Sequence, residues 1–143
     1  MGAGVAGICV LAWLAALSFY DIRERRLPNW LTMPGAAVVL AIAAIHGRAV
    51  PAMLGAVALF AVYVVVHLVS AAATGAGDVK LAIGIGALTG TFGRDVWVLA
   101  ALGAPVLTAG WAIVAALRRS GPTVPHGPSM CLAAGTATSL AVF

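Results

Sequence analysis

Two aspartates are the best candidates for chemistry in this chain, because each adjoins a long apolar stretch. Asp78 lies in the segment GAGDVK, residues 75–80, between two apolar runs, and Asp21 follows the charge-free residues 1–20. An acid within or at the edge of a membrane segment is costly and normally faces a partner or a water-filled cavity. We therefore interpret both as functional residues and each as the partner of the other.

A pair of close carboxylates can do the work of an aspartic protease. The two groups cannot easily both ionise, so they share a proton, and one acts as a base toward water while the other donates to a carbonyl. Gly75 and Gly77 flank this site in the sequence. They would let the backbone approach a substrate strand, or adopt dihedral angles that other residues avoid.

Other catalytic chemistries have little support in the sequence. Ser18 and Ser70 have no histidine base in a recognised arrangement, and the histidines are scattered singly. Cys9 and Cys131 lack a second cysteine or histidine at the spacing of metal ligands. We therefore expect neither a metal nor a cofactor.

Three other interpretations of the aspartates stand beside the catalytic one. They can be plain loop acids paired with Arg23 and Lys80, a proton relay in a small proton-coupled transporter or channel component, or replaceable residues of a structural assembly subunit. Glu24 and Asp95 each adjoin an arginine. We assign these two acids to solvated loops.

The composition predicts a membrane protein. Of 143 residues, 63% are hydrophobic and only 8% are charged, and the mean hydropathy is +1.10, which excludes an ordinary soluble domain. The net charge of +4 does not indicate nucleic-acid binding, because most basic residues adjoin predicted spans, where they orient a membrane protein. We expect one integral-membrane domain, residues 1–143, embedded in a lipid bilayer.

Six charge-poor intervals predict an all-α bundle of about six transmembrane helices. The predicted helices cover about residues 4–20, 30–45, 50–70, 78–92, 96–117 and 129–143. Pro28 marks the turn before the second helix, whose first turn tolerates Pro34. Only the third and fifth are unambiguous spans by length. Gly86 and Gly90 form a small-residue pattern that suits close helix packing.

The predicted fourth helix is too short to cross a bilayer unaided. It would rise about 21 Å, against about 30 Å for the hydrocarbon core. If its far end reaches the opposite interface, Asp78 lies below the near surface, in a cavity lined by protein and reached by water.

The basic residues predict the orientation of the bundle. The loops after the first, third and fifth helices hold Arg23, Arg25, Arg26, Lys80, Arg118 and Arg119, whereas the other loops hold Arg48 and Arg94. The richer set belongs in the cytoplasm. Asp21 and Asp78 are then both cytoplasmic, and both chain termini lie outside.

Several motifs resemble those of the type IV prepilin peptidases. The segment at 75–80 resembles their GxGD motif, with Lys80 two residues past the acid, and DIR at 21–23 with LPN at 27–29 is similar to their other aspartate motif. PHGP at 125–128 resembles a late proline-glycine motif, although His126 stands where an aromatic residue is expected.

The resemblance implies a function and a set of site residues. It implies that Asp21 and Asp78 are catalytic, and that the substrate is the basic leader of a pilin-like precursor, cut on the cytoplasmic side after a glycine. It also implies a set of site-shaping or substrate-orienting residues, Gly75, Gly77, Lys80, Arg23, Pro28 and Asn29. Because no cysteine-containing methyltransferase insert is present, the chain resembles the short, peptidase-only form that serves tight-adherence-type pili or related filaments.

Overall fold

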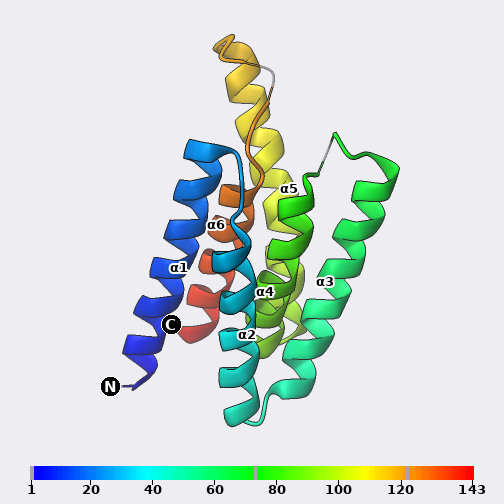
Figure 1. Cartoon of the computed structure of the whole chain (residues 1–143). Helices are drawn as coiled ribbons and strands as arrows, with labels where there is room; N and C mark the ends of the chain where they lie inside the picture. The colour runs from blue at the N-terminus through cyan, green and yellow to red at the C-terminus, as the bar shows by residue number, and fades with distance from the viewer. Residues whose placement is uncertain (1, 73, 122) are drawn as a thin grey trace.

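The protein is a bundle of α-helices. A computed structural model describes residues 2–72, 74–121 and 123–143, and in these residues the chain forms six helices and no strand. The helices are α1 (Gly2–Glu24), α2 (Asn29–Ile45), α3 (Ala49–Val69), α4 (Ala76–Phe92), α5 (Arg94–Leu117) and α6 (Gly127–Val142) (Figure 1). The prediction of an all-α fold with six helices is confirmed.

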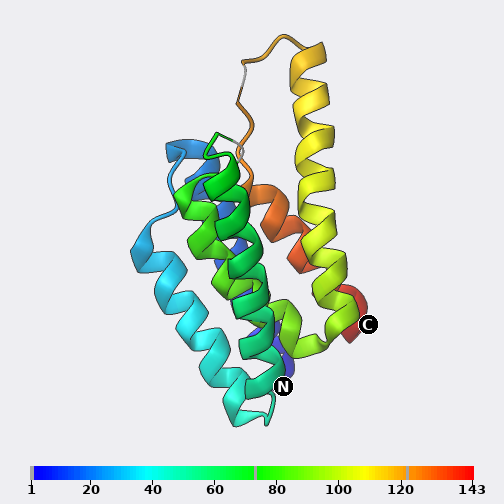
Figure 2. The same cartoon turned by 90° about the vertical axis from the view of Figure 1, so that its right-hand side faces the viewer.

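Helix α4 lies at the centre of the bundle. It packs against α2, α3, α5 and α6 (Figures 1 and 2), and most of its residues from Asp78 to Gly90 are buried. A helix that is apolar or small on all sides is suited to such a position. Asp78, in the first turn of this central helix, is thereby surrounded by protein.

Small residues let α3 and α4 approach closely. A Cβ atom added at Gly86 would clash with the carbonyl oxygen of Gly55, and one at Gly90 would lie 2.6 Å from the carbonyl oxygen of Pro51. Trp97 closes the interface from α5, because its indole N–H donates to the Gly55 oxygen at 3.0 Å. The packing role predicted for Gly86 and Gly90 is confirmed.

This contact predicts a stability effect. Gly86→Ala should destabilise the bundle by about 1–3 kcal/mol, because the added methyl group overpacks a backbone contact, and thermal unfolding in detergent should shift to lower temperature. Gly110→Ala is the matched control, since a Cβ at Gly110 has nothing within 4 Å. Equal melting temperatures for the two variants would contradict the close contact.

Three helices are long and apolar enough to cross a membrane: Gly4–Glu24, Ala49–Val69 and Arg94–Leu117. The protein is therefore a multi-pass membrane protein. Helices α2 and α4 have 17 residues each and rise only about 25 Å, less than the roughly 30 Å core. From length, only the third and fifth predicted helices were unambiguous spans. Helix α1 is also long enough to span a membrane, because it continues to Glu24.

Two predicted helix boundaries differ from the structure. Asp21 lies inside α1, one turn before its end, whereas the sequence placed it just after the first helix. Helix α2 begins at Asn29, so Pro34 lies in its second turn. The missing N–H of Pro34 leaves the carbonyl one turn earlier, that of Trp30, without its intrahelical donor.

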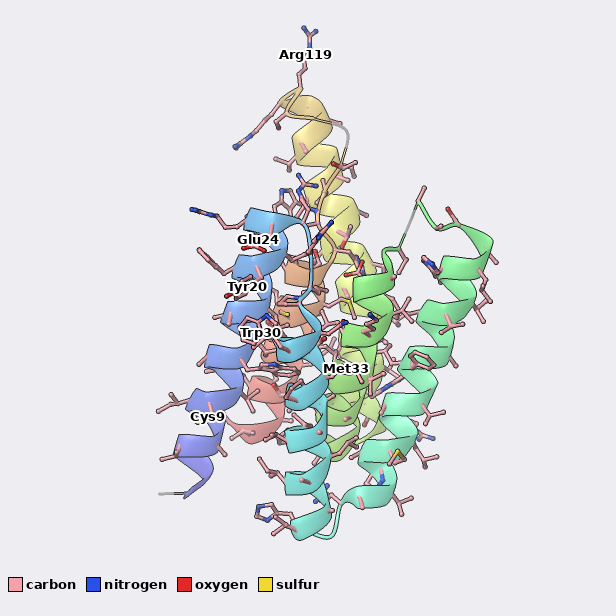
Figure 3. All side chains as sticks on the ribbon, in the orientation of Figure 1. Cys9, Tyr20, Glu24, Trp30, Met33 and Arg119 are labelled. Atoms are coloured by element: carbon pink, nitrogen blue, oxygen red, sulfur yellow. The ribbon has the colours of Figure 1, made fainter. Side chains whose placement is uncertain are left out.

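The helix ends that carry the candidate residues gather at one end of the bundle. The ends of α1 and α3 and the starts of α2, α4 and α6 lie toward one end of the bundle, α5 projects beyond them on the same side, and both chain termini lie toward the other end (Figures 1 and 2). Tyr20 and Trp30 close the connection from α1 to α2, with ring centroids 5.6 Å apart in an edge-to-face contact (Figure 3). Asp21 and Asp78 therefore lie toward the same end of the bundle, as predicted.

Candidate active site

Asp21 is a buried acid in the last turns of α1, with 7% of its surface exposed. Its carboxylate Oδ2 accepts a hydrogen bond from the backbone N–H of Gly127 at 3.0 Å. Gly127 is the first residue of α6, and the first N–H groups of a helix have no partner within the helix. The start of α6 therefore supplies a donor to this carboxylate.

Asp78 is a second buried acid, in the first turn of α4, with 8% of its surface exposed. Its Oδ2 accepts the backbone N–H of Gly75 at 3.3 Å, and Gly75 is the N-cap residue of the helix. An acid in the first turn is favoured because it satisfies a free N–H and faces the positive end of the helix dipole. A contact within the local sequence therefore helps to orient the Asp78 carboxylate.

The fold brings the two carboxylates together. The charge of Asp21 acts on Asp78, and the charges of both acids act on Cys131 of α6, which is buried. The aspartates come from α1 and α4, and α6 lies against both of these helices. Two acids far apart in the sequence are therefore both buried at one end of the bundle, and the charge of one acts on the other.

The basic residues suggested as plain partners make other contacts. Arg23 lies over the ring of Phe19, 5.6 Å from its centroid, and is exposed. The Lys80 ammonium donates to the side-chain oxygen of Asn29 at 2.9 Å. Arg25 is the basic residue whose charge reaches Asp21. The two acids are held by backbone N–H groups, and the interpretation as ordinary loop ion pairs loses its basis.

The predicted site-shaping residues fall into two groups. Pro28 caps α2 with φ −69°, and Asn29 and Lys80 tie the start of α2 to the first turns of α4. A Cβ at Gly77 would lie 3.2 Å from Cβ of Leu27, so this glycine allows close packing of the same segment. Arg23 points away from this group, over Phe19.

The glycines do not supply unusual backbone angles. Gly75 has φ −72° and ψ 156°, which any residue can adopt, and Gly77 lies within α4. Of the two roles considered for these glycines, unusual dihedral angles are wrong, and approach of the backbone to a substrate strand stays a prediction. Within the fold, Gly77 packs closely against Leu27.

A histidine next to Gly127 was not predicted as part of the site. The ring of His126 makes two hydrogen bonds, one between Nε2 and the Tyr63 hydroxyl at 2.7 Å and one between Nδ1 and the Thr108 hydroxyl at 2.6 Å. Burial lowers the pKa of His126, so the ring is neutral at pH 7. Gly127 and His126 lie in the PHGP segment, which was the available signal, whereas Tyr63 and Thr108 lie in apolar helices.

The other two acids of the chain, Glu24 and Asp95, lie at the surface. They are exposed, as predicted, but they lie in the ends of helices α1 and α5 and not in loops. The Arg119 side chain points away from the bundle at the end of α5 (Figure 3). The connection before α6 is held at α1, because Arg25 donates to the backbone and side-chain oxygens of Thr123 at 3.0 Å. Among the described residues, no group of three or more His, Cys, Asp and Glu is arranged to hold a metal ion.

A multi-pass helical bundle with a buried acid pair at one end defines the class of this protein, and comparison with known proteins identifies its family. The chain matches the type IV leader peptidase family over residues 8–118. The match covers more than half of the chain and includes both aspartates, so the protein belongs to this family. No curated protein and no solved structure matches the chain significantly.

Proposed function

We propose that this family member is an aspartic endopeptidase that removes the basic leader of pilin-like precursors, with Asp21 and Asp78 as its catalytic pair. The observation that carries the proposal is the burial of both carboxylates at one end of the bundle, where each accepts a backbone N–H and the charge of Asp21 acts on Asp78. Membership of a peptidase family supports the same activity.

The mechanism uses one water between the carboxyl groups. The ionised aspartate removes a proton from the water as it attacks the scissile carbonyl carbon, while the protonated aspartate donates to the carbonyl oxygen. The tetrahedral intermediate then collapses, and a proton passes to the leaving amine. We assign the base to Asp21, because its 3.0 Å bond from Gly127 stabilises the charged form more than the 3.3 Å bond from Gly75 stabilises Asp78.

The site-shaping residues act around this pair in the proposal. Lys80 and Asn29 join α4 to α2 beside Asp78, and Pro28 fixes where α2 begins. This joint holds the first turn of α4 in place, so that substrate binding does not displace the acid. The other predicted site-shaping residues lie at the same end of the bundle: Gly75, Gly77 and Arg23.

A co-expression experiment tests the proposed function. A tagged pilin-like precursor should lose its leader when it is expressed with this protein and keep it with an empty vector, as read by intact mass. A precursor in which the last leader glycine is replaced by valine is the control and should stay uncut. A precursor that keeps its leader in the presence of well-expressed wild-type protein would contradict the proposal.

We propose further that the product keeps an unmodified N-terminus. The two cysteines lie in α1 and α6, one exposed and one buried, and the chain carries no cysteine-rich insert of the kind linked with methylation. Purified enzyme supplied with precursor and S-adenosylmethionine should yield a product without an added methyl group, and a mass increase of one methyl group would contradict this.

The site is proposed to face the cytoplasm, since the richer set of basic residues lies at the same end of the bundle. In a Cys9→Ala background, Arg48→Cys and Arg94→Cys should react with an impermeant thiol reagent in intact cells. Arg25→Cys and Arg118→Cys should react only after permeabilisation. The background protein, which retains buried Cys131, is the unlabelled control. Labelling of Arg25→Cys from outside would reverse the orientation.

A further inference from the structure

His126 joins three helices at the edge of the acid site. Its ring bonds the hydroxyl of Tyr63, which is in α3, and that of Thr108, which is in α5, while the residue itself is the N-cap of α6. The rings of His126 and Tyr63 also pack together, with centroids 5.6 Å apart. A neutral imidazole has one donor and one acceptor nitrogen, and each hydroxyl can act in either sense. Both ring nitrogens are therefore satisfied, and the ring has two fixed anchors.

His126 is connected to both aspartates through its neighbours Gly127 and Tyr63. Its backbone is followed directly by Gly127, whose N–H donates to Asp21. Its partner Tyr63 is buried and lies close enough to Asp78 to feel the charge of that carboxylate. A shift of the His126 ring would therefore move the amide that bonds one acid and the hydroxyl that lies near the other.

We propose that His126 is a positioning residue for the aspartate pair: Tyr63 and Thr108 anchor its ring, and this anchored ring fixes the Gly127 amide on Asp21. The inference rests on the proposed function for its catalytic consequence, but not for the geometry itself. It gives a reason for a histidine at a position where a plain aromatic ring would fill the same space. A phenyl ring would leave both hydroxyls without this partner.

The first test measures catalysis by the full-length protein in detergent with a leader-bearing precursor peptide. His126→Phe should lower kcat roughly 10- to 100-fold through misplacement of the reacting group, with KM within about threefold of wild type. His126→Gln, which can keep one of the side-chain hydrogen bonds, should recover part of this loss. His46→Phe is the matched control, because His46 is exposed at the far end of α2 and should retain wild-type kcat.

A double variant separates positioning from a general loss of packing. If His126 acts with Tyr63 through their shared hydrogen bond, Tyr63→Phe combined with His126→Phe should be no slower than His126→Phe alone. A wild-type kcat for His126→Phe, or a double variant whose losses multiply in full, would overturn the proposal.

The second test does not depend on activity. Hydrogen exchange of the Gly127 amide, read at single-residue resolution, should be at least about tenfold faster in His126→Phe than in wild type, because the bond to Asp21 opens more often. His46→Phe should leave it unchanged. Unchanged exchange in His126→Phe would overturn the positioning role. If exchange responds as expected but the wild-type protein cuts no leader, the proposed function fails while the positioning of the Gly127 amide stands.

Discussion

Replacing either aspartate with asparagine should reduce leader cleavage by roughly a thousandfold or more, and replacing both should cause no further loss. The reason is that the two carboxyl groups share one proton and act as a unit, so removal of either disables the general acid–base step. The measurement is the single-turnover rate of purified Asp21→Asn, Asp78→Asn and the double variant with a precursor peptide.

The control for this experiment is Asp95→Asn. Asp95 is exposed in the first turn of α5, at the end of the bundle opposite the acid pair, and its loss should leave the rate within about twofold of wild type, as is usual for surface substitutions. Losses that multiply in the double variant would mean that the acids act independently. An Asp21→Asn enzyme that cleaves at the wild-type rate would exclude the pair.

The substitution Gly127→Ala should strongly lower the rate of cleavage, because it adds a methyl group next to the Asp21 carboxylate. A Cβ at this position would lie 2.6 Å from Oδ2 and 3.0 Å from Cγ of Asp21, closer than carbon approaches such atoms without displacement. The carboxylate must then move, and a displacement near 1 Å at a reacting group costs on the order of a hundredfold in rate. The expected result is a fall in kcat of about that size, measured with the same peptide.

Gly110→Ala is again the matched control, because the added methyl group meets nothing within 4 Å. It should leave kcat unchanged. Full activity of Gly127→Ala would show that the hydrogen bond between Gly127 and Asp21 has no part in the reaction, and the assignment of Asp21 as the base would lose its support.

The sequence predicted the helices well because charges interrupt the apolar runs at nearly every connection. Asp21 was placed after the first helix because a charge was taken as its end, yet α1 continues to Glu24. Burial against the start of α6 compensates for the acid within the helix, since Gly127 bonds its carboxylate.

The shared side of Asp21 and Asp78 was predictable, because an odd number of connections between two helix ends places them on one side of a bundle. The contributions of Tyr63 and Thr108 were not. They lie in helices that are apolar around most of their circumference, so no amphipathic face indicates which side turns toward the site. Their contacts with His126 join residues 63 and 18 positions apart, and only the packed bundle reveals them.

The most direct test of the central claim compares wild-type protein with the double variant Asp21→Asn, Asp78→Asn in proteoliposomes that contain a pilin-like precursor and a pH-sensitive dye. We expect wild-type protein to remove the leader, as seen by intact mass, and the double variant to leave the precursor whole. Under a proton gradient, neither protein should change the internal pH faster than it changes in protein-free vesicles. An uncut precursor together with an aspartate-dependent proton flux in the wild-type vesicles would contradict this expectation and favour a proton relay.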